Sequence, residues 1–290
     1  MSTTDLENLP MDRAITAVTH DGSFRVIAVR STRTARGIVK NQGATDRTVE
    51  NLADLVSGTV LMRLTMAPGY RVQGIIQGAG GHGTLIGDSW PDGGTRGLVR
   101  ASTGPVTFGS GARMQVMRTM PNGAMHQGLV EVSNEHRMSG ALMNYLLESE
   151  QVTSAIGVGC VTSGDEVLLA GGYVVQLLPE CSEPPLAVMY ERLRNDFADL
   201  SRVLAELDAD PDRLVAEILH GMRYERTQEY PLDFRCRCSA ERVLASLATV
   251  GKDELEDMIH KAEPLSISCD YCQQEYQVQT EMLRGLLSAS

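Results

Sequence analysis

Two pairs of cysteines near the end of the chain carry its most definite chemistry. Cys236 and Cys238 form a Cys-x-Cys pair and Cys269 and Cys272 form a Cys-x-x-Cys pair, so four of the six cysteines are paired at short spacing. Thiolates are ligands that zinc prefers, and four of them complete the tetrahedral shell of a structural site. Short spacing brings two sulfur atoms onto one turn with little strain. The pattern therefore predicts one zinc ion held by these four residues.

Permanent disulfides, or cysteines with no common partner, are the alternatives to a zinc site. Residues 1–7 are polar and acidic and lack the basic and apolar segments of a secretory signal. No apolar run approaches the ~18 residues that a membrane-spanning helix needs. We therefore expect a soluble, cytoplasmic protein with no membrane partner. Cytosolic thiols are normally kept reduced, which favours the zinc site over disulfides.

A zinc site of this kind has a second chemical property. Zinc-bound thiolates are already deprotonated, so peroxide or hypochlorous acid can oxidise them if they are accessible, and each pair can close on itself as a disulfide. The metal would then lose its ligands. Because metal binding supplies much of the folding free energy of a small domain, oxidation would be expected to unfold it. The site can therefore act as a switch as well as a structural support.

Composition limits the fold classes and the partners that remain possible. The chain has 290 residues, 42% of them hydrophobic and 22% charged, which is enough for a substantial core and a smaller module. A formal net charge of −11 argues against a general nucleic-acid partner, because phosphate contacts need clustered Lys and Arg. Acidic residues also outnumber basic residues after Pro231.

Sequence motifs give no sign of a nucleotide site or of catalysis. Residues 78–83 match the dinucleotide fingerprint G-x-G-x-x-G, but the residues that follow indicate a short strand and a turn, whereas the fingerprint needs a helix. We predict a glycine-rich hairpin there. No nucleophile elbow, metalloprotease motif or P-loop occurs, and the histidines have no motif spacing. We expect no enzymatic activity and no catalytic residues. The unmatched histidines are His20, His82, His126 and His136.

Residues 1–181 are predicted to form an α+β domain that ends near Cys181. Helical periodicity begins near Thr48, with apolar residues from Leu52 to Leu64, and a second helix is predicted over residues 138–149 with Leu142, Tyr145 and Leu146 on one face. Stretches rich in β-branched residues predict strands. These strands cover residues 24–30, 71–77, 113–118, 127–132, 155–161 and 166–178.

Residues 182–230 read as a helical linker with one apolar face. Pro184 and Pro185 begin a helix that is predicted to run to Leu207. Its apolar stripe consists of Leu186, Met189, Tyr190, Leu193, Phe197, Leu200, Leu204 and Leu207. Asp210 and Pro211 cap and begin a second helix, with Leu214, Val215, Ile218 and Leu219 facing inward. We expect the stripe to pack on the core at rest and to be released in an active state. The candidate client-binding residues are Leu193, Phe197, Leu200 and Leu204.

Residues 231–290 are expected to form the small zinc domain. Ser239 is a plausible N-cap of one helix, and residues 252–260 form another. His260 is interpreted as a helix C-terminal residue and not as a ligand, since four cysteines are available. Cys160 and Cys181 have no close partner in sequence and are read as inert, small apolar residues.

The cysteine pairs, with helices between them, closely resemble the redox-regulated heat-shock chaperones called the 33 kDa chaperonin family. The resemblance covers most of the chain. Further short motifs that match are Arg96-Gly97, Gln127-Gly128, Tyr145 with Ser149-Glu150-Gln151, and Ala170-Gly171-Gly172. Two departures stand out: His126 replaces a common tyrosine, and Gln273 follows the last cysteine where a glycine is frequent.

This resemblance implies a holdase that binds unfolding client proteins without ATP. In the family the reduced, zinc-bound form is inactive. Oxidation forms the disulfides Cys236–Cys238 and Cys269–Cys272, ejects zinc and destabilises the linker, and the active form is usually a dimer. The alternative from another class is a constitutive zinc-stabilised module for protein or nucleic-acid binding with no redox switching.

Overall fold

The computed structural model describes residues 9–100, 106–132, 137–150, 153–248, 250–260 and 265–289. The acidic start of the chain, His136 and Gln151 lie outside these residues. The chain divides into two compact units, one that ends at Arg235 and one that begins at Cys236. Each unit mixes helices and strands, which confirms the predicted α+β class.

The first unit is built on two sheets. Sheet A has the strand order β10 (Tyr224–Pro231), β1 (Arg13–Thr19), β2 (Phe24–Arg30), β9 (Glu166–Leu177), β8 (Ser154–Ser163). Sheet B has the order β11 (Asp233–Phe234), β5 (Gly94–Arg100), β4 (Thr84–Ser89), β3 (Arg71–Gln77), β6 (Ala112–Thr119), β7 (Met125–Val132). All neighbouring strands run antiparallel except β11 and β5.

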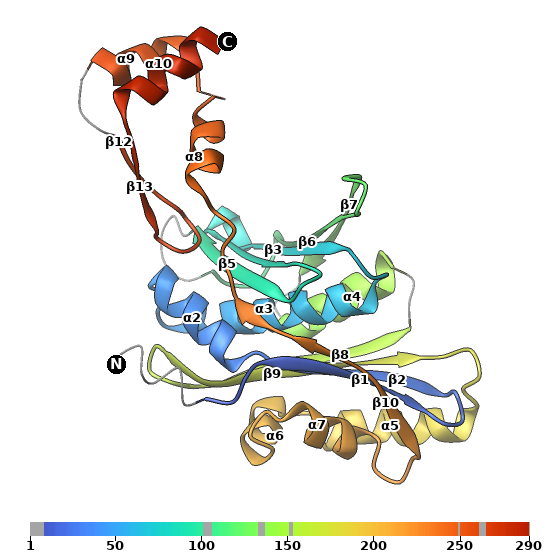
Figure 1. Ribbon diagram of the computed structural model, residues 1–290. Coiled ribbons are helices and arrows are strands. Elements are labelled where there is room, and N and C mark those ends of the chain that lie inside the picture. The colour runs from blue at the N-terminus through green and yellow to red at the C-terminus, as the bar shows by residue number, and fades with distance from the viewer. Residues whose placement is uncertain are drawn as a thin grey trace. The chain divides into compact units, whose positions relative to one another are not determined.

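Three helices fill the space between the sheets. They are α2 (Thr32–Gln42), α3 (Arg47–Thr65) and α4 (Met138–Glu148), and Figure 1 shows them as a layer of their own. Helix α3 is buried on almost all sides, including every residue from Leu55 to Leu64, because it is covered by a sheet on each face. This layer holds the main hydrophobic core.

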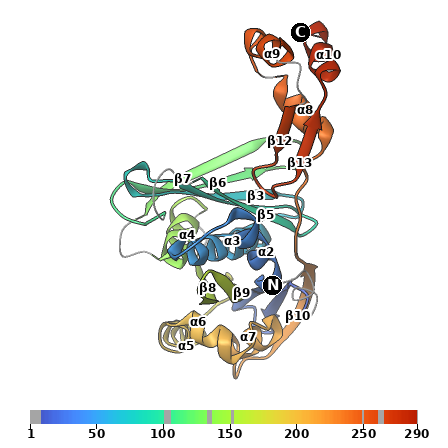
Figure 2. The ribbon, with the colours of Figure 1, turned by 90° about the vertical axis from the view of Figure 1, so that its left-hand side faces the viewer.

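The other face of sheet A is covered by the linker helices, α5 (Glu183–Asn195), α6 (Leu200–Glu206) and α7 (Pro211–Ile218), as the rotated view in Figure 2 shows. Their apolar residues form a second core with strands β1, β2 and β9. The linker helices therefore belong to the first compact unit in this state.

The predicted continuous helix from Pro184 to Leu207 is wrong. The first linker helix ends at Asn195, and a second helix begins after Asp199. The Asp199 carboxylate caps this second helix by accepting a hydrogen bond from the backbone N–H of Arg202 at 3.1 Å. The break turns the ring of Phe197 onto that of Tyr173, edge to face, with centroids 5.5 Å apart. Upstream of the break most of the α5 side chains are not buried.

The end of the predicted linker also differs, because residues 224–231 form strand β10 and not helix. Two residues of the predicted apolar stripe, Leu186 and Tyr190, are 42% and 59% exposed and do not pack on the core, because they lie on the outer side of α5. The predicted strands and helices of the core agree with the structure. Strands β2 and β3 have the predicted bounds, and helices α3 and α4 begin within one residue of the predicted starts. The glycine-rich segment lies in a hairpin in which Gln77 pairs with Thr84, with a single 3-10 turn and no α-helix.

The second unit is small. It contains α8 (Ala240–Leu247), α9 (Lys252–His260), the hairpin of β12 (Leu265–Ser268) and β13 (Glu275–Val278), and α10 (Thr280–Ala289). Ser239 accepts a hydrogen bond from the N–H of Arg242, which confirms the predicted N-cap. Its core rests on Leu247, Leu255, Val278 and Leu283. Further apolar residues of the unit pack against this core but are only partly buried. A unit of this size buries little apolar surface, so a bound metal ion would add to its stability.

Candidate metal centre

The four paired cysteines lie on two loops of the second unit. Cys236 and Cys238 lie in an extended segment just before α8, where alternate residues point to the same side. Cys269 and Cys272 lie in the turn that joins β12 to β13. That turn is closed by two backbone hydrogen bonds, from Cys269 N–H to Gln274 O at 2.9 Å and from Gln273 N–H to Cys269 O at 2.8 Å.

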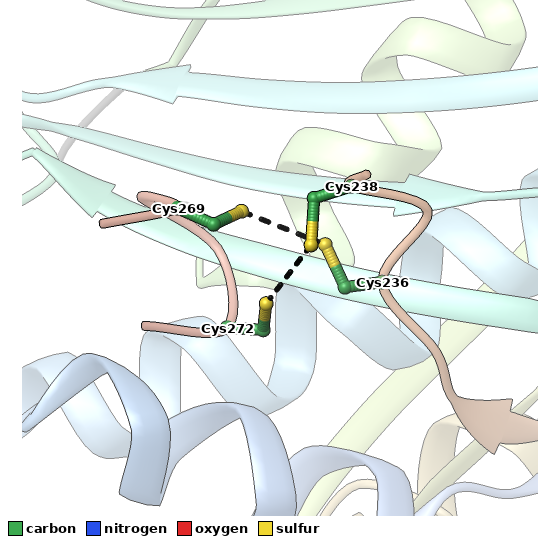
Figure 3. Close-up of side chains that lie close together, drawn as sticks. All are labelled: Cys236, Cys238, Cys269 and Cys272. Carbon is green, nitrogen blue, oxygen red and sulfur yellow. Dashed lines mark hydrogen bonds between the residues drawn. The ribbon is translucent and has the colours of Figure 1, made fainter. Parts of the chain in front are cut away.

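The two loops bring all four sulfur atoms together (Figure 3). The Sγ atoms of Cys236 and Cys269 are 3.7 Å apart, those of Cys238 and Cys272 are 3.4 Å apart, and all four lie within 4.8 Å of one another. A tetrahedral zinc with Zn–S bonds of ~2.3 Å needs sulfur atoms ~3.8 Å apart. The four donors therefore fit a tetrahedral metal ion such as zinc.

The electrostatics of the cluster also favour a bound cation. Burial raises the pKa of the Cys269 thiol, and the neighbouring Cys236 thiol adds to the effect. Burial likewise raises the pKa of Cys272, with contributions from the other three thiols. Four thiolates this close would repel one another, so the cluster can ionise only if a positive charge compensates them.

A tyrosine hydroxyl is part of the site. The Oη of Tyr276, on β13, donates a hydrogen bond to the Sγ of Cys238 at 3.0 Å, and this bond raises the pKa of Tyr276 to about 12. A hydrogen bond from such a donor stabilises a ligating sulfur and fixes its orientation. The sequence alone gave no sign of this contact, because it depends on the β12–β13 register, in which Tyr276 pairs with Ile267.

The cysteine turn contains one strained residue. Gln273 has φ of +59°, in the left-handed region that glycine adopts without penalty. This is the position at which the sequence departs from the glycine common in the family it resembles. The unusual residue therefore stands where the backbone conformation favours glycine, directly after the last ligand.

Other predicted residues lie outside the cluster. Among the described residues, the four cysteines form the only group of His, Cys, Asp and Glu close enough to share a metal ion, and His260 ends α9 without joining it. The described histidines His20, His82 and His126 lie in three different parts of the first unit.

The two remaining cysteines are also separate from the cluster. Cys160 is buried on β8, and burial together with the carboxyl group of Asp54 raises the pKa of its thiol, which disfavours the reactive thiolate. The thiol of Cys181 donates to the carbonyl oxygen of Ser182 at 3.4 Å.

The four candidate client-binding residues are covered in this state. Phe197 is 5% exposed, Leu200 is 8% exposed, Leu204 is fully buried and Leu193 is partly buried, all in the core between the linker helices and sheet A. They can contact another protein only if the linker leaves the sheet.

Charged contacts tie the linker to sheet A. Asp210 caps α7 by accepting the backbone N–H groups of Asp212 and Arg213, and its carboxylate also pairs with Arg13 at 3.4 Å and Arg30 at 3.3 Å. Arg30 is 7% exposed and also donates to the carbonyl oxygen of Asp208. The sequence predicted the cap, but it did not predict the two arginines that hold it.

Comparison with known proteins gives one consistent result. The family model described as "Hsp33 protein" matches residues 12–279. Curated proteins named "33 kDa chaperonin" are similar over nearly their whole length. The protein from Syntrophotalea carbinolica is 29% identical over 96% of this chain and 99% of its own. That from Acaryochloris marina is 30% identical over 95% of this chain and 96% of its own.

A solved structure shows the same fold. The crystal structure of a 33 kDa chaperonin from Thermotoga maritima superposes with a TM-score of 0.80, at 21% identity, over 96% of this chain and 98% of that one. The matched relatives are named chaperonins and not enzymes. Within the described residues, no helix is long and apolar enough to cross a membrane.

Proposed function

We propose a specific function from one established premise: the chain belongs to the Hsp33 family. The family is one of chaperones, and the proposal concerns how this member is controlled. We propose that it is an ATP-independent holdase, inactive when reduced and zinc-bound, and activated when oxidation forms disulfides and releases zinc. The observation that carries the proposal is the convergence of four sulfur atoms on two loops of a unit with a small core.

In the reduced state the four cysteines would hold one zinc ion. When bound, zinc would keep the sulfurs as thiolates and tie the segment before α8 to the β12–β13 turn. Tyr276 would support Cys238 through its hydrogen bond. Because the core of this unit is small, the two loops would depend on this connection.

Oxidation would replace the bonds from the cysteines to zinc with disulfide bonds. In each pair two thiols lose two protons and two electrons and gain one S–S bond, while hydrogen peroxide accepts them and becomes two molecules of water. We propose the pairing Cys236–Cys238 and Cys269–Cys272 from the resemblance. Either this pairing or the cross-loop one is within reach, since all four sulfurs lie within 4.8 Å. Once oxidised, the sulfurs no longer bind a metal ion.

Loss of the zinc domain would then loosen the linker, in keeping with the proposed division into a core (1–181), a linker (182–230) and a zinc domain (231–290). Helices as short as α5, α6 and α7 are marginal in water and remain folded only while packed. Their release would expose Leu193, Phe197, Leu200 and Leu204 to unfolding client proteins, which such an apolar surface suits without a specific sequence.

The remaining parts of the proposal concern setting and partners. A cytoplasmic location would keep the thiols reduced until oxidant appears. We propose a homodimer as the active form, and a binding function without nucleotide, nucleic acid or catalysis.

Aggregation of a thermally unfolding protein such as citrate synthase, followed by light scattering, tests the proposal. Oxidised protein should suppress the scattering and reduced, zinc-loaded protein should not. The paired control is the Cys269→Ser, Cys272→Ser variant treated with the same oxidant. Equal suppression by reduced and oxidised protein would instead support a constitutive zinc-stabilised binding module.

A further inference from the structure

A single segment covers the edges of both sheets in the first unit. We call residues 224–235 the strap. Its first part, β10, pairs antiparallel with β1 from Tyr224 opposite Thr19 to Pro231 opposite Arg13, and its last part, β11, pairs with β5. Figure 1 shows β10 along the edge of sheet A. The strap leads directly into Cys236, the first predicted zinc ligand.

The first part of the strap is held by its backbone ladder and by side chains near its two ends. The side chains of residues 225–229 are exposed. Tyr224 and Tyr230 pack against the apolar clusters on the two faces of sheet A, and Glu229 pairs with Arg13 at 3.7 Å. The ladder also shifts register between Thr16 and Ala17. Main-chain hydrogen bonds of this kind do not depend on side-chain identity, so another extended chain can replace β10 without matching its sequence.

The last part of the strap is held by two apolar side chains. Leu232 is 3% exposed and its N–H donates to the carbonyl oxygen of Asp12 at 3.1 Å. Phe234 packs so closely over Gly37 that a Cβ there would lie 3.1 Å from the ring. Leu232 belongs to the main core, and Phe234 packs against that core beside α2. We call the space that these two side chains occupy the recess.

The crossing between the two parts is tight. Gly93 has φ of +85°, and a Cβ at this position would lie 2.0 Å from the carbonyl oxygen of Pro231. The backbone of the strap therefore passes so close to Gly93 that no side chain would fit there. Removing the strap would leave an unpaired strand edge, β1, that leads into an apolar recess.

We propose that this edge and recess are a binding site for an extended apolar segment of an unfolding client, which adds to β1 as a strand once the strap has left. The inference rests on the proposed function and deepens it by naming the surface. Unfolding proteins expose extended segments with free backbone groups, and an exposed edge strand is a template for pairing. The recess adds a preference for large apolar side chains two residues apart.

Such a site would bind clients of many sequences and would favour those with large apolar side chains. Backbone pairing along β1 accepts most sequences. Tyr224 and Tyr230 of the strap pack against the apolar clusters on the two faces of sheet A, and apolar client side chains at the same positions would pack in the same way. A client segment without apolar residues could form the backbone hydrogen bonds to β1 but could not fill the recess, and would therefore bind more weakly.

A peptide with the strap sequence, residues 224–235, tests the proposal. Added to oxidised protein, it should compete with unfolding citrate synthase and restore light scattering. A peptide with aspartate in place of Leu232 and Phe234 keeps the backbone and should compete on the order of a hundredfold less well, because two large apolar contacts are lost. Hydrogen exchange of the β1 amides supplies the second readout: exchange should quicken on oxidation and slow again when client is added.

The outcomes separate this inference from the function on which it rests. If oxidised protein suppresses aggregation while β1 stays unprotected with client, or if neither peptide competes, the site is wrong and the holdase function stands. If β1 becomes protected without client in proportion to protein concentration, a second copy of the chain occupies the edge and the proposal is overturned. If oxidised protein does not suppress aggregation, both fail.

Discussion

Replacing Asp210 with alanine should release the linker without any oxidation. The Asp210 carboxylate accepts two backbone N–H groups at the start of α7, at 3.0 and 3.1 Å, and pairs with Arg13 and Arg30. The variant loses the N-cap, which contributes ~1 kcal/mol to helix stability. It also leaves the Arg30 guanidinium, 7% exposed, with the carbonyl oxygen of Asp208 as its remaining hydrogen-bond acceptor among the described residues.

The second effect adds about 1–2 kcal/mol, a reduced value because the carboxylate itself is partly exposed to water. The total of about 2–3 kcal/mol raises the released population of the linker roughly 30- to 150-fold. Hydrogen exchange of α5, α6 and α7 in the reduced variant measures this release directly. Aggregation suppression by the same reduced sample shows whether release is enough for activity.

Glu206→Ala is the matched control. Glu206 lies on α6 and pairs with Arg202 at 2.8 Å, but both side chains are more than half exposed, so the pair contributes little to stability. The control should behave as the unmodified protein in both assays. The reasoning is refuted if Asp210→Ala protects the linker amides as well as Glu206→Ala does. If the linker loosens and the reduced variant still does not suppress aggregation, linker release does not control activity.

Three further predictions concern single residues. Gln273→Gly should stabilise the zinc-loaded second unit against thermal unfolding by about 0.5–1 kcal/mol, because φ is +59° at this position. The control Gln274→Gly should destabilise the unit. Equal shifts in Tm for the two variants would contradict the claim that Gln273 is strained. Tyr276→Phe should weaken zinc binding by roughly tenfold in a chelator competition, since Cys238 loses a hydrogen bond, and an unchanged affinity would remove the tyrosine from the site. Burial raises the pKa of Asp54 to about 7, so the stability that its protonated carboxyl gives is complete below the unfolded pKa near 4 and is lost progressively as pH rises to 7. Asp54→Asn should therefore gain stability over the unmodified protein across this range, by up to about 4 kcal/mol at pH 8 and by little at pH 3 to 4. A uniform shift in Tm across pH would contradict this.

Elements governed by burial could be predicted from the sequence. Strand β2 and helix α3 have strong apolar patterns because they are covered on both faces, and their bounds were predicted closely. Strand β10 was not predicted, because most of its side chains are polar and exposed and only Tyr224 and Tyr230 pack on the apolar clusters. The break in the linker helix was missed because the apolar stripe continues across it, although Asp199 caps the helix that follows.

The candidate metal site was likewise predicted only in part. Short spacing places two thiols side by side whatever the fold, so the ligand set could be proposed from Cys236, Cys238, Cys269 and Cys272 alone. The contacts around the cysteine cluster and the linker depend on strand register and on packing between distant segments. Tyr276 reaches Cys238 only through the β12–β13 hairpin, and Arg30 reaches Asp210 only across the face of sheet A. No local pattern contains that information.

Titration of one zinc-loaded, reduced sample with hydrogen peroxide tests the central claim most directly. Zinc release, followed with a metal-binding dye, and suppression of citrate synthase aggregation should rise together as the Cys236–Cys238 and Cys269–Cys272 disulfides form, as measured by mass spectrometry of digested protein. Full activity before any zinc is released, or complete zinc release with no gain in activity, would contradict the proposal that this thiol cluster controls the chaperone.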